Sequence, residues 1–291
     1  MATLAPLIVI TGPTGSGKSD LAVRLAEKYD GEIVCADSRT VYKGMDIGTA
    51  KPTVEDRRRV PHHLLDVVTP DTTFTLYDFQ KLAKQTIDEI RSRDHVPFLV
   101  GGTGLYIDSV VLDFELGEAG DAAERARLED MSVNELQEML KKHHIQFPTN
   151  PLNKRHLIRA WEQKGINIRG KSKPSSDVYV VAITTDTNLL NERIERRADQ
   201  MFSGGVLQEA KELGQKYGWN SEAMSGNIYP ILKQVLDGTL TETEAKQLFV
   251  IKDRQLAKRQ LTWLKRHNFV KWLDLASAED YITAVLDGRS A

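Results

Sequence analysis

The N-terminal third of the chain alternates short apolar runs with longer amphipathic stretches. The runs Leu7–Ile10, Glu32–Ala36 and Val96–Val100 have the length and composition of strands that are buried on both faces. Between the last two, Tyr77–Arg91 has apolar residues at helical spacing. Strands that alternate with helices in this way predict a parallel sheet covered by helices, with ligand sites where the strands end.

The pattern changes in the middle of the chain. Residues 113–176 are rich in helical periodicity, with candidate helices at Ala122–Asp130 and Val133–Lys142, and contain no convincing strand. Val178–Ile183 again has a strand pattern. One interrupted sheet explains this order better than two successive domains. We therefore predict an α/β core of residues 1–112 and 177–291, with a helical insertion domain at 113–176.

The C-terminal part predicts a long helix followed by a short strand. Thr241 opens a capping-box pattern, and helical periodicity continues to about Trp263. Phe269–Leu273 is typical of a strand that closes the sheet. An earlier helix carries Arg193 and Arg197 one turn apart, and this spacing places both on one face.

A phosphate-binding loop is the strongest motif in the chain. It follows the first predicted strand, precedes a helix and matches G-x-x-x-x-G-K-[ST] at every position: Gly12, Pro13, Thr14, Gly15, Ser16, Gly17, Lys18 and Ser19. Glycines let the backbone wrap around an anion, and amides at the helix N-terminus point towards it. Lys18 supplies a charge for the outer phosphates, and the Ser19 hydroxyl is a candidate Mg²⁺ ligand.

Composition narrows the class of protein. The chain of 291 residues has 41% hydrophobic and 27% charged residues, and no apolar run is long enough for a membrane span. The residues before the first strand lack the basic region of a secretory signal. Cys35, the only cysteine, lies in an apolar run and is expected to be a buried thiol. We therefore expect a cytoplasmic protein.

Positive charge is unevenly distributed. The formal net charge is only −2. Yet one stretch near the C-terminus has a single opposing acid, Asp253, among seven cations: Lys252, Arg254, Lys258, Arg259, Lys265, Arg266 and Lys271. Such a stretch can follow a phosphate backbone, or it can be an ordinary solvated helix face.

The residues after the second and third strands bear on what the phosphate loop does. An ATPase or GTPase normally has a second carboxylate for Mg²⁺ at the end of a neighbouring strand. Here the third strand ends in the glycine-rich segment Gly101–Gly104, and the carboxylate, Asp37, follows the second strand. Asp37 can accept a proton, help to hold Mg²⁺ or simply cap a loop. These features alone leave a small-molecule kinase open.

A longer segment resembles the signature of one family. Residues 36–52, ADSRTVYKGMDIGTAKP, are similar to the signature of the tRNA dimethylallyltransferases. Four further segments agree with that family: Gly12-Pro13-Thr14, Pro61–Asp66, Val100–Tyr106 and Ala257–Leu264. Together the segments extend over nearly the whole chain, and the ordered set is far more specific than the phosphate motif alone.

The resemblance implies a reaction and its partners. The family transfers a dimethylallyl group from dimethylallyl diphosphate to the exocyclic N6 of the adenosine next to the anticodon, at tRNA position 37, and releases diphosphate. It implies Mg²⁺ as cofactor, the anticodon stem-loop of tRNA as the macromolecular substrate and no obligatory protein partner. We accordingly expect a monomer.

The resemblance also assigns residues. Asp37 matches the catalytic carboxylate, and Arg197 matches an arginine that clamps the diphosphate together with the loop. The adenosine pocket would be lined by Asp37, Ser38, Arg39, Thr40 and Thr103. Further contacts to tRNA would come from the insertion and the C-terminal helix: Arg125, Arg155, Arg159, Lys258, Arg259, Gln260, Trp263 and Lys265. Without the family, the Trp263 ring is expected in the core, and His62 and His63 are expected to be hydrogen-bonded structural residues.

Two segments depart from the family pattern. Gly226–Ile231 keeps a tyrosine but lacks the cation that usually follows it, and Phe147–Pro151 replaces a longer family segment. Recognition of RNA is the property that these changes affect. Three alternatives stay open: prenylation of free adenine nucleotides, an ATP-dependent small-molecule kinase and, because of the altered Gly226–Ile231 segment, an RNA-binding relative without turnover.

Overall fold

The computed structural model describes residues 4–116, 121–164 and 170–288. The stretch that lacks a secretory signal pattern thus lies partly outside the described residues. The chain forms two compact units, one of Met1–Val111 with Lys173–Ala291 and one of Leu112–Ser172. The predicted insertion was 113–176.

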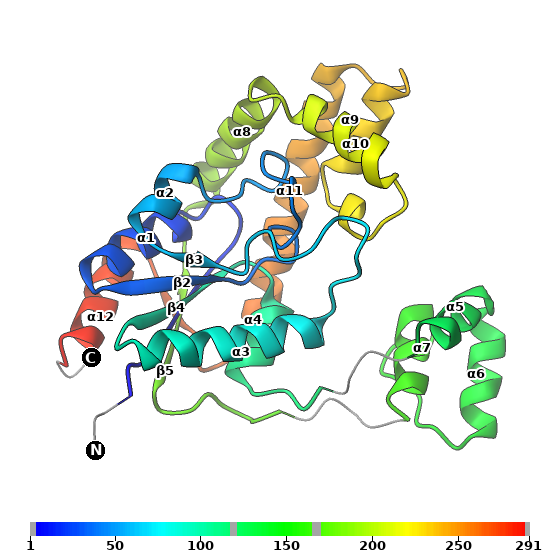
Figure 1. The fold of residues 1–291 in the computed structure, drawn as a ribbon, viewed down its shortest axis with the longest axis horizontal. Coiled ribbons are helices and arrows are strands. Elements are labelled where there is room, and N and C mark those ends of the chain that lie inside the picture. The colour runs from blue at the N-terminus through cyan, green and yellow to red at the C-terminus, as the bar shows by residue number, and fades with distance from the viewer. Residues whose placement is uncertain (1–3, 117–120, 165–169, 289–291) are drawn as a thin grey trace. The chain divides into compact units, whose positions relative to one another are not determined.

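The larger unit, the core unit, is built on a six-stranded parallel sheet (Figure 1). Its strands are β1 (Leu7–Thr11), β2 (Gly31–Cys35), β3 (His62–His63), β4 (Val96–Gly101), β5 (Val178–Ile183) and β6 (Lys271–Leu273). They lie in the order β3-β2-β4-β1-β5-β6. The predicted α/β class is confirmed, and the segments that follow β2, β4 and β1 leave the sheet side by side at one edge.

Helices cover both faces of this sheet. On one face, α1 (Lys18–Lys28) and α12 (Leu275–Leu286) share a hydrophobic cluster with alternate strand residues such as Ile8 and Phe98. On the other face lie α3 (Leu76–Ser92) and α4 (Gly104–Val111) (Figure 1). Because both faces are covered, the central strands are almost wholly apolar.

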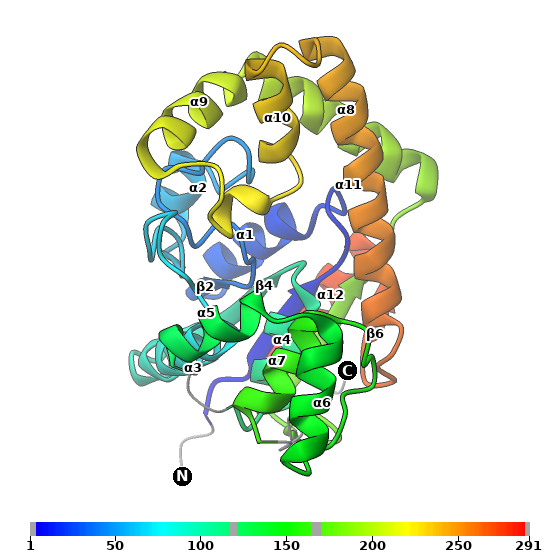
Figure 2. The same cartoon turned by 90° about the vertical axis from the view of Figure 1, so that its right-hand side faces the viewer.

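The core unit contains further helices. They are α2 (Val54–Arg59), α8 (Thr187–Ser203), α9 (Val206–Tyr217), α10 (Tyr229–Leu236) and α11 (Glu242–Leu264), with a short turn at Ala223–Ser225. Thr241 and Glu244 form the predicted capping box of α11. Figure 2 shows α11 running beside α8 and α10, and Ala257 packs there against Leu190 and Ile194.

The insertion unit contains α5 (Ala122–Asp130), α6 (Val133–Lys142) and α7 (Lys154–Glu162). They surround a small hydrophobic core of Leu128, Leu136, Leu140, Leu157 and Ile158. Helical periodicity predicted the first two helices. It did not single out α7, which is short and rich in cations.

Several residues are structural, as predicted. Cys35 is buried, and burial raises the pKa of its thiol to about 12, so it is an inert strand residue. His62 Nδ1 lies 2.8 Å from the Val60 carbonyl oxygen, and His63 Nε2 lies 2.6 Å from a carboxylate oxygen of the buried Glu32. None of the described helices combines the length and the apolar composition needed to cross a bilayer.

Candidate active site

The phosphate loop depends on glycine for its shape. Gly15 and Gly17 have φ of 79° and 87°, in the left-handed region that disfavours other residues, and Gly17 directly precedes the first turn of α1. A Cβ atom on Gly17 would also lie 3.0 Å from the Leu275 side chain. Glycine at these two positions therefore allows the loop to direct the amides at the N-terminus of α1 towards one bound anion.

Buried donors around this loop lack partners. Among the described residues, Ser16 Oγ of the loop and Arg197 Nε, whose guanidinium contacts Thr14, are buried polar atoms without a hydrogen bond. Leaving a buried donor unsatisfied typically costs about 1–3 kcal/mol, so such groups are normally paired. Their presence beside a phosphate loop fits a site that takes an anion with several oxygens.

Lys18 supplies a cation whose charge depends on pH. Its Nζ donates to the Pro13 carbonyl oxygen at 3.3 Å. Burial and the positive charge of Arg197 together lower the pKa of Lys18 to about 8, while Asp37 and Asp253 oppose the shift. An incoming anion would favour the charged form of this lysine.

Two arginines of α8 reach the loop. Arg197 Nη1 donates to the Thr14 hydroxyl and lies 3.4 Å from Asp253 Oδ2. Arg193 Nη1 donates to the Gly15 carbonyl oxygen at 3.2 Å. The prediction that both arginines share one helix face is confirmed, and that face is turned to the phosphate loop.

Gln260 of α11 links the loop to the end of β4. The Thr14 amide donates to Gln260 Oε1 at 2.9 Å, and Gln260 Nε2 donates to the Gly102 carbonyl oxygen at 3.1 Å. Both polar atoms of a residue predicted to contact tRNA are thus engaged inside the protein. The contact fixes the distance between two of the three strand ends.

Asp37 lies just after the end of β2. Its Oδ1 accepts a hydrogen bond from the Arg39 amide at 2.8 Å, and the Ser38 amide donates to Thr103 Oγ1 at 3.2 Å. Asp37 therefore caps its loop, and it also lies near enough to Lys18 to raise the pKa of that lysine. Contacts thus bring together Asp37, Ser38, Thr103 and the phosphate loop.

Two residues near Asp37, Thr40 and Arg39, differ in whether their side chains are free to bind a ligand. Thr40 Oγ1 is buried and has no hydrogen-bond partner in the described structure, which suits a hydroxyl that meets a ligand. The Arg39 guanidinium instead donates to the Glu222 carbonyl oxygen at 2.6 Å and to Ser225 Oγ at 3.4 Å. Arg39 holds the turn after α9 in place.

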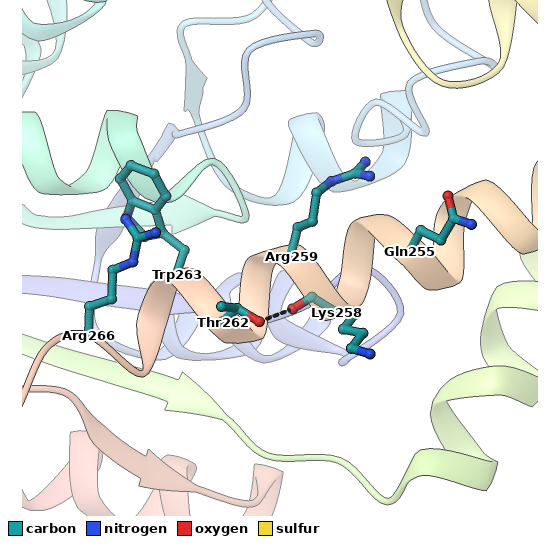
Figure 3. Close-up of a pocket in the computed structure, with 6 residues that line it drawn as sticks. All are labelled: Gln255, Lys258, Arg259, Thr262, Trp263 and Arg266. Carbon is teal, nitrogen blue, oxygen red and sulfur yellow. Dashed lines mark hydrogen bonds between the residues drawn. The ribbon is translucent and has the colours of Figure 1, made fainter. Parts of the chain in front are cut away.

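A second feature, which we call the α11 groove, has a volume of about 520 Å³. It is lined by one face of α11, with Gln255, Lys258, Arg259, Thr262 and Trp263, and by Arg266 just after the helix ends (Figure 3). Trp263 is half-buried rather than part of the core. Its Nε1 donates to Asp108 Oδ2 at 2.7 Å, and its ring leaves no room for a Cβ on Gly104.

The basic stretch divides into paired and exposed cations. Arg254 forms an ion pair with Glu195, Arg266 stacks over the Trp263 ring at 4.7 Å, and Lys271 lies 3.6 Å from the centre of the Tyr281 ring. Lys258 and Arg259 are exposed in the α11 groove, and Lys265 is exposed where α11 ends. The charge pattern alone did not separate these two groups.

The predicted arginines of the insertion unit are partly neutralised there. Arg125 contacts Glu129 at 3.1 Å and Glu162 at 2.9 Å, and Arg159 contacts Glu162 at 3.3 Å. Arg155 is exposed. These residues belong to the insertion unit, whereas the phosphate loop belongs to the core unit.

Sequence reasoning missed two acidic residues of the core unit. Asp253 appeared only as the exception in a basic stretch, although it is buried beside Arg197. Glu209 accepts hydrogen bonds from the amides of residues 46–48 at 2.7–2.9 Å and from the Tyr229 hydroxyl at 2.9 Å. Burial raises the pKa of Tyr229, and Glu209 also raises it, so the neutral hydroxyl donates to Glu209 and helps to hold residues 46–48. No sequence signal marked either acid.

Comparison of the sequence with known proteins identifies a family and several relatives. A family model described as IPP transferase matches residues 40–267. A tRNA dimethylallyltransferase of Pelotomaculum thermopropionicum is 37% identical over 292 residues, which cover 94% of this chain and 92% of the relative. One from Desulforudis audaxviator is 40% identical and covers 94% of both chains.

Solved structures give the same result. The full-length tRNA isopentenylpyrophosphate transferase of Bacillus halodurans has a TM-score of 0.74 and 36% identity, with 97% of each chain covered. A eukaryotic dimethylallyltransferase acting on tRNA has a TM-score of 0.82 at 22% identity, covering 98% of this chain and 80% of that one. At that identity the second likeness concerns the fold alone.

Proposed function

Because this chain belongs to the IPP transferase family, we propose that it transfers a dimethylallyl group from dimethylallyl diphosphate to N6 of the adenosine beside the anticodon of tRNA. One observation carries this proposal. A phosphate loop surrounded by unpaired buried donors is hydrogen-bonded, through neighbouring strand ends, to a segment that begins with a carboxylate. The end of β4 supplies glycines where a phosphoryl-transfer enzyme would have an acid.

The reaction exchanges one bond for another at carbon. Adenosine N6 attacks the first carbon of the dimethylallyl group, the bond from that carbon to the diphosphate oxygen breaks, and the electron pair leaves with the diphosphate. The N6 proton passes to Asp37, which acts as general base. Positioned bases are typically worth about 10²–10⁴-fold in rate.

The loop residues stabilise the leaving group. Lys18, the amides at the start of α1 and Arg197 all direct positive charge to the place where the diphosphate gains charge. The planar guanidinium of Arg197 suits two phosphate oxygens at once. Arg193 supports the loop by donating a hydrogen bond to the Gly15 carbonyl oxygen.

The residues fit Mg²⁺ that is bound together with the substrate. In the described parts of the chain, no group of three or more histidine, cysteine or acidic side chains could hold a metal ion alone. The Ser19 hydroxyl is exposed at the first turn of α1, where it can ligate a cation that also binds phosphate oxygens and water. When bound, Mg²⁺ neutralises charge on the departing diphosphate.

For tRNA we propose two sets of contacts. The exposed cations Lys258, Arg259 and Lys265 follow the RNA backbone, and the Trp263 ring in the α11 groove offers a stacking surface. Arg125, Arg155 and Arg159 contact the RNA from the insertion unit. The target adenosine leaves its stack to reach the pocket of Asp37, Ser38, Thr40 and Thr103. The enzyme then works as a monomer in the cytoplasm, where tRNA is available.

The test compares acceptors and chemistry in one experiment. The protein is incubated with dimethylallyl diphosphate, Mg²⁺ and either unmodified tRNA with adenosine beside the anticodon or free AMP. Mass spectrometry of nucleosides should show dimethylallyl adenosine from the tRNA and at most traces from AMP. Preference for AMP would assign a free-nucleotide enzyme, and tRNA binding without product would assign a non-catalytic relative.

A further inference from the structure

Asp253 is a buried acid among the cations of the proposed diphosphate site. It lies on α11, is only 2% exposed and has its Oδ2 3.4 Å from Arg197 Nη1. Lys18 and Asp37 also act on it electrostatically. A carboxylate in this place is unexpected, because the site is otherwise built to receive an anion.

Asp253 shares its cation with the phosphate loop. The nitrogen of Arg197 that faces Asp253 is the same Nη1 that donates to the Thr14 hydroxyl. An anion bound at the loop would therefore compete with Asp253 for one guanidinium. The distance of 3.4 Å is at the long end for a charge-assisted hydrogen bond, so the internal pair is weak enough to be exchanged.

One donor near Asp253 is not used by that carboxylate. Arg197 Nε is buried and has no hydrogen-bond partner in the described structure, whereas Asn227 lowers the pKa of the Asp253 carboxyl through a side-chain hydrogen bond. Burial raises this pKa, while Arg197, Asn227 and Lys18 favour the charged form. The unused Arg197 Nε suits an anion with more acceptor oxygens than a carboxylate.

We propose that Asp253 is an internal competitor anion for Arg197, which weakens diphosphate binding and thereby favours release of the diphosphate product. This inference rests on the proposed function, since it takes the loop to be the diphosphate site. When the diphosphate leaves, Arg197 is neutralised by Asp253, so the departing product need not leave behind an unpaired buried guanidinium.

We expect the negative charge of Asp253 to affect diphosphate binding more than its contact with Arg197 does. Removing the carboxylate loses one long contact to Arg197, but the Thr14 contact remains to orient the guanidinium. It also removes a buried negative charge beside a polyanion, and buried charges interact strongly because water screens them little. Neutral Asp253 variants should therefore bind diphosphate more tightly than the native protein does.

The chain offers a matched control in the same pair of helices. Asp199 of α8 pairs with Lys246 of α11 at 2.7 Å, and both side chains are largely exposed. Asp199→Asn removes the same formal charge and a link between the same helices as Asp253→Asn does. It does so outside the cluster of Arg197, Lys18 and Asp253.

The experiment is calorimetric titration of the full-length protein with inorganic pyrophosphate in the presence of Mg²⁺. Asp253→Asn should lower the Kd at least about tenfold, and Asp199→Asn should leave it within about twofold of the native value. Asp253→Ala, which lacks any hydrogen-bonding group, should also tighten binding. In turnover, pyrophosphate should inhibit both Asp253 variants at lower concentrations than it inhibits the native enzyme.

The possible failures are distinguishable. If the native protein binds pyrophosphate and the Asp253 variants bind it equally or more weakly while keeping the native melting temperature, Asp253 is a positioning residue and the inference is overturned. A parallel gain in Asp199→Asn would also overturn it, because the effect would then be one of net charge. If neither native protein nor variants bind pyrophosphate, the proposed function fails as well.

Discussion

The phosphate loop and the basic surfaces of this protein both present cations, but the structure prepares them differently. Around the loop, donors are buried and await an anion, and the charge on Arg197 and Lys18 is directed by hydrogen bonds to the loop itself. In the insertion unit, Arg125 and Arg159 are already paired with Glu162. The first region is a preformed site that recognises a defined group, whereas the second must exchange partners or rely on charge.

Removal of Asp37 should have the largest effect and separates chemistry from binding. Asp37→Asn should lower the single-turnover rate about 10²–10⁴-fold, because N6 loses its base. Pyrophosphate affinity should not fall, since a negative charge near Lys18 is removed. Rapid-quench kinetics and calorimetry measure the two quantities. A comparable loss in both would make Asp37 a loop-capping residue only.

Loss of Arg197 should come next. Arg197→Met should raise the Kd for pyrophosphate about 10–100-fold, as expected when charge-assisted hydrogen bonds worth roughly 1.5–3 kcal/mol are lost. The adjacent Arg196, which is exposed, provides the control. Arg196→Met removes the same charge from α8 and should change the Kd less than about twofold. Equal effects would mean that the helix acts only through its overall charge.

The pKa of Lys18 predicts a pH dependence of intermediate size. The free protein loses the Lys18 proton near pH 8, whereas bound diphosphate favours the charged form and keeps the proton. The Kd for pyrophosphate should therefore rise above pH 8, by up to about tenfold per pH unit. Lys18→Arg should remove this rise, because arginine stays charged. A rise of the same size in that variant would assign the titration to another group.

Single cations on the two surfaces that we propose to bind RNA should have the smallest effects. Lys258→Ala removes an exposed cation of the α11 groove and should weaken tRNA binding a few-fold, with the slope of log affinity against log salt reduced by about one. Arg125→Ala should weaken binding less, because Arg125 already neutralises Glu129 and Glu162. Filter binding at several salt concentrations measures both. A larger loss for Arg125→Ala would reverse the order of the two surfaces.

The features that the sequence could predict are those that depend on local requirements. The phosphate loop was predictable because its conformation needs glycine at Gly15 and Gly17, and the strands were predictable because burial on both faces leaves only apolar residues. Strand ends were less certain: the closing strand was predicted from Phe269 but begins at Lys271. The helix α7 was not singled out, because its cations obscure the pair Leu157 and Ile158 that packs into the small core.

Pairing between distant residues was beyond sequence reasoning. Nothing local indicates that Gln260 bridges Thr14 and Gly102, or that Arg254 is neutralised by Glu195 while Lys258 stays exposed. Asp253 is the clearest case, since it looked like a gap in a basic stretch and is instead buried beside Arg197. Such roles follow from which helices pack together, and this is a property of the tertiary fold.

We infer that the phosphate loop holds a leaving group while carbon is transferred. A decisive experiment uses dimethylallyl diphosphate labelled with ¹⁴C in the prenyl group and ³²P in the diphosphate, with unmodified tRNA as acceptor. The tRNA should gain ¹⁴C without ³²P, and an equal amount of labelled diphosphate should be released as pyrophosphate. Recovery of ³²P in the tRNA, or release of orthophosphate in place of pyrophosphate, would show that the loop does not hold a leaving group.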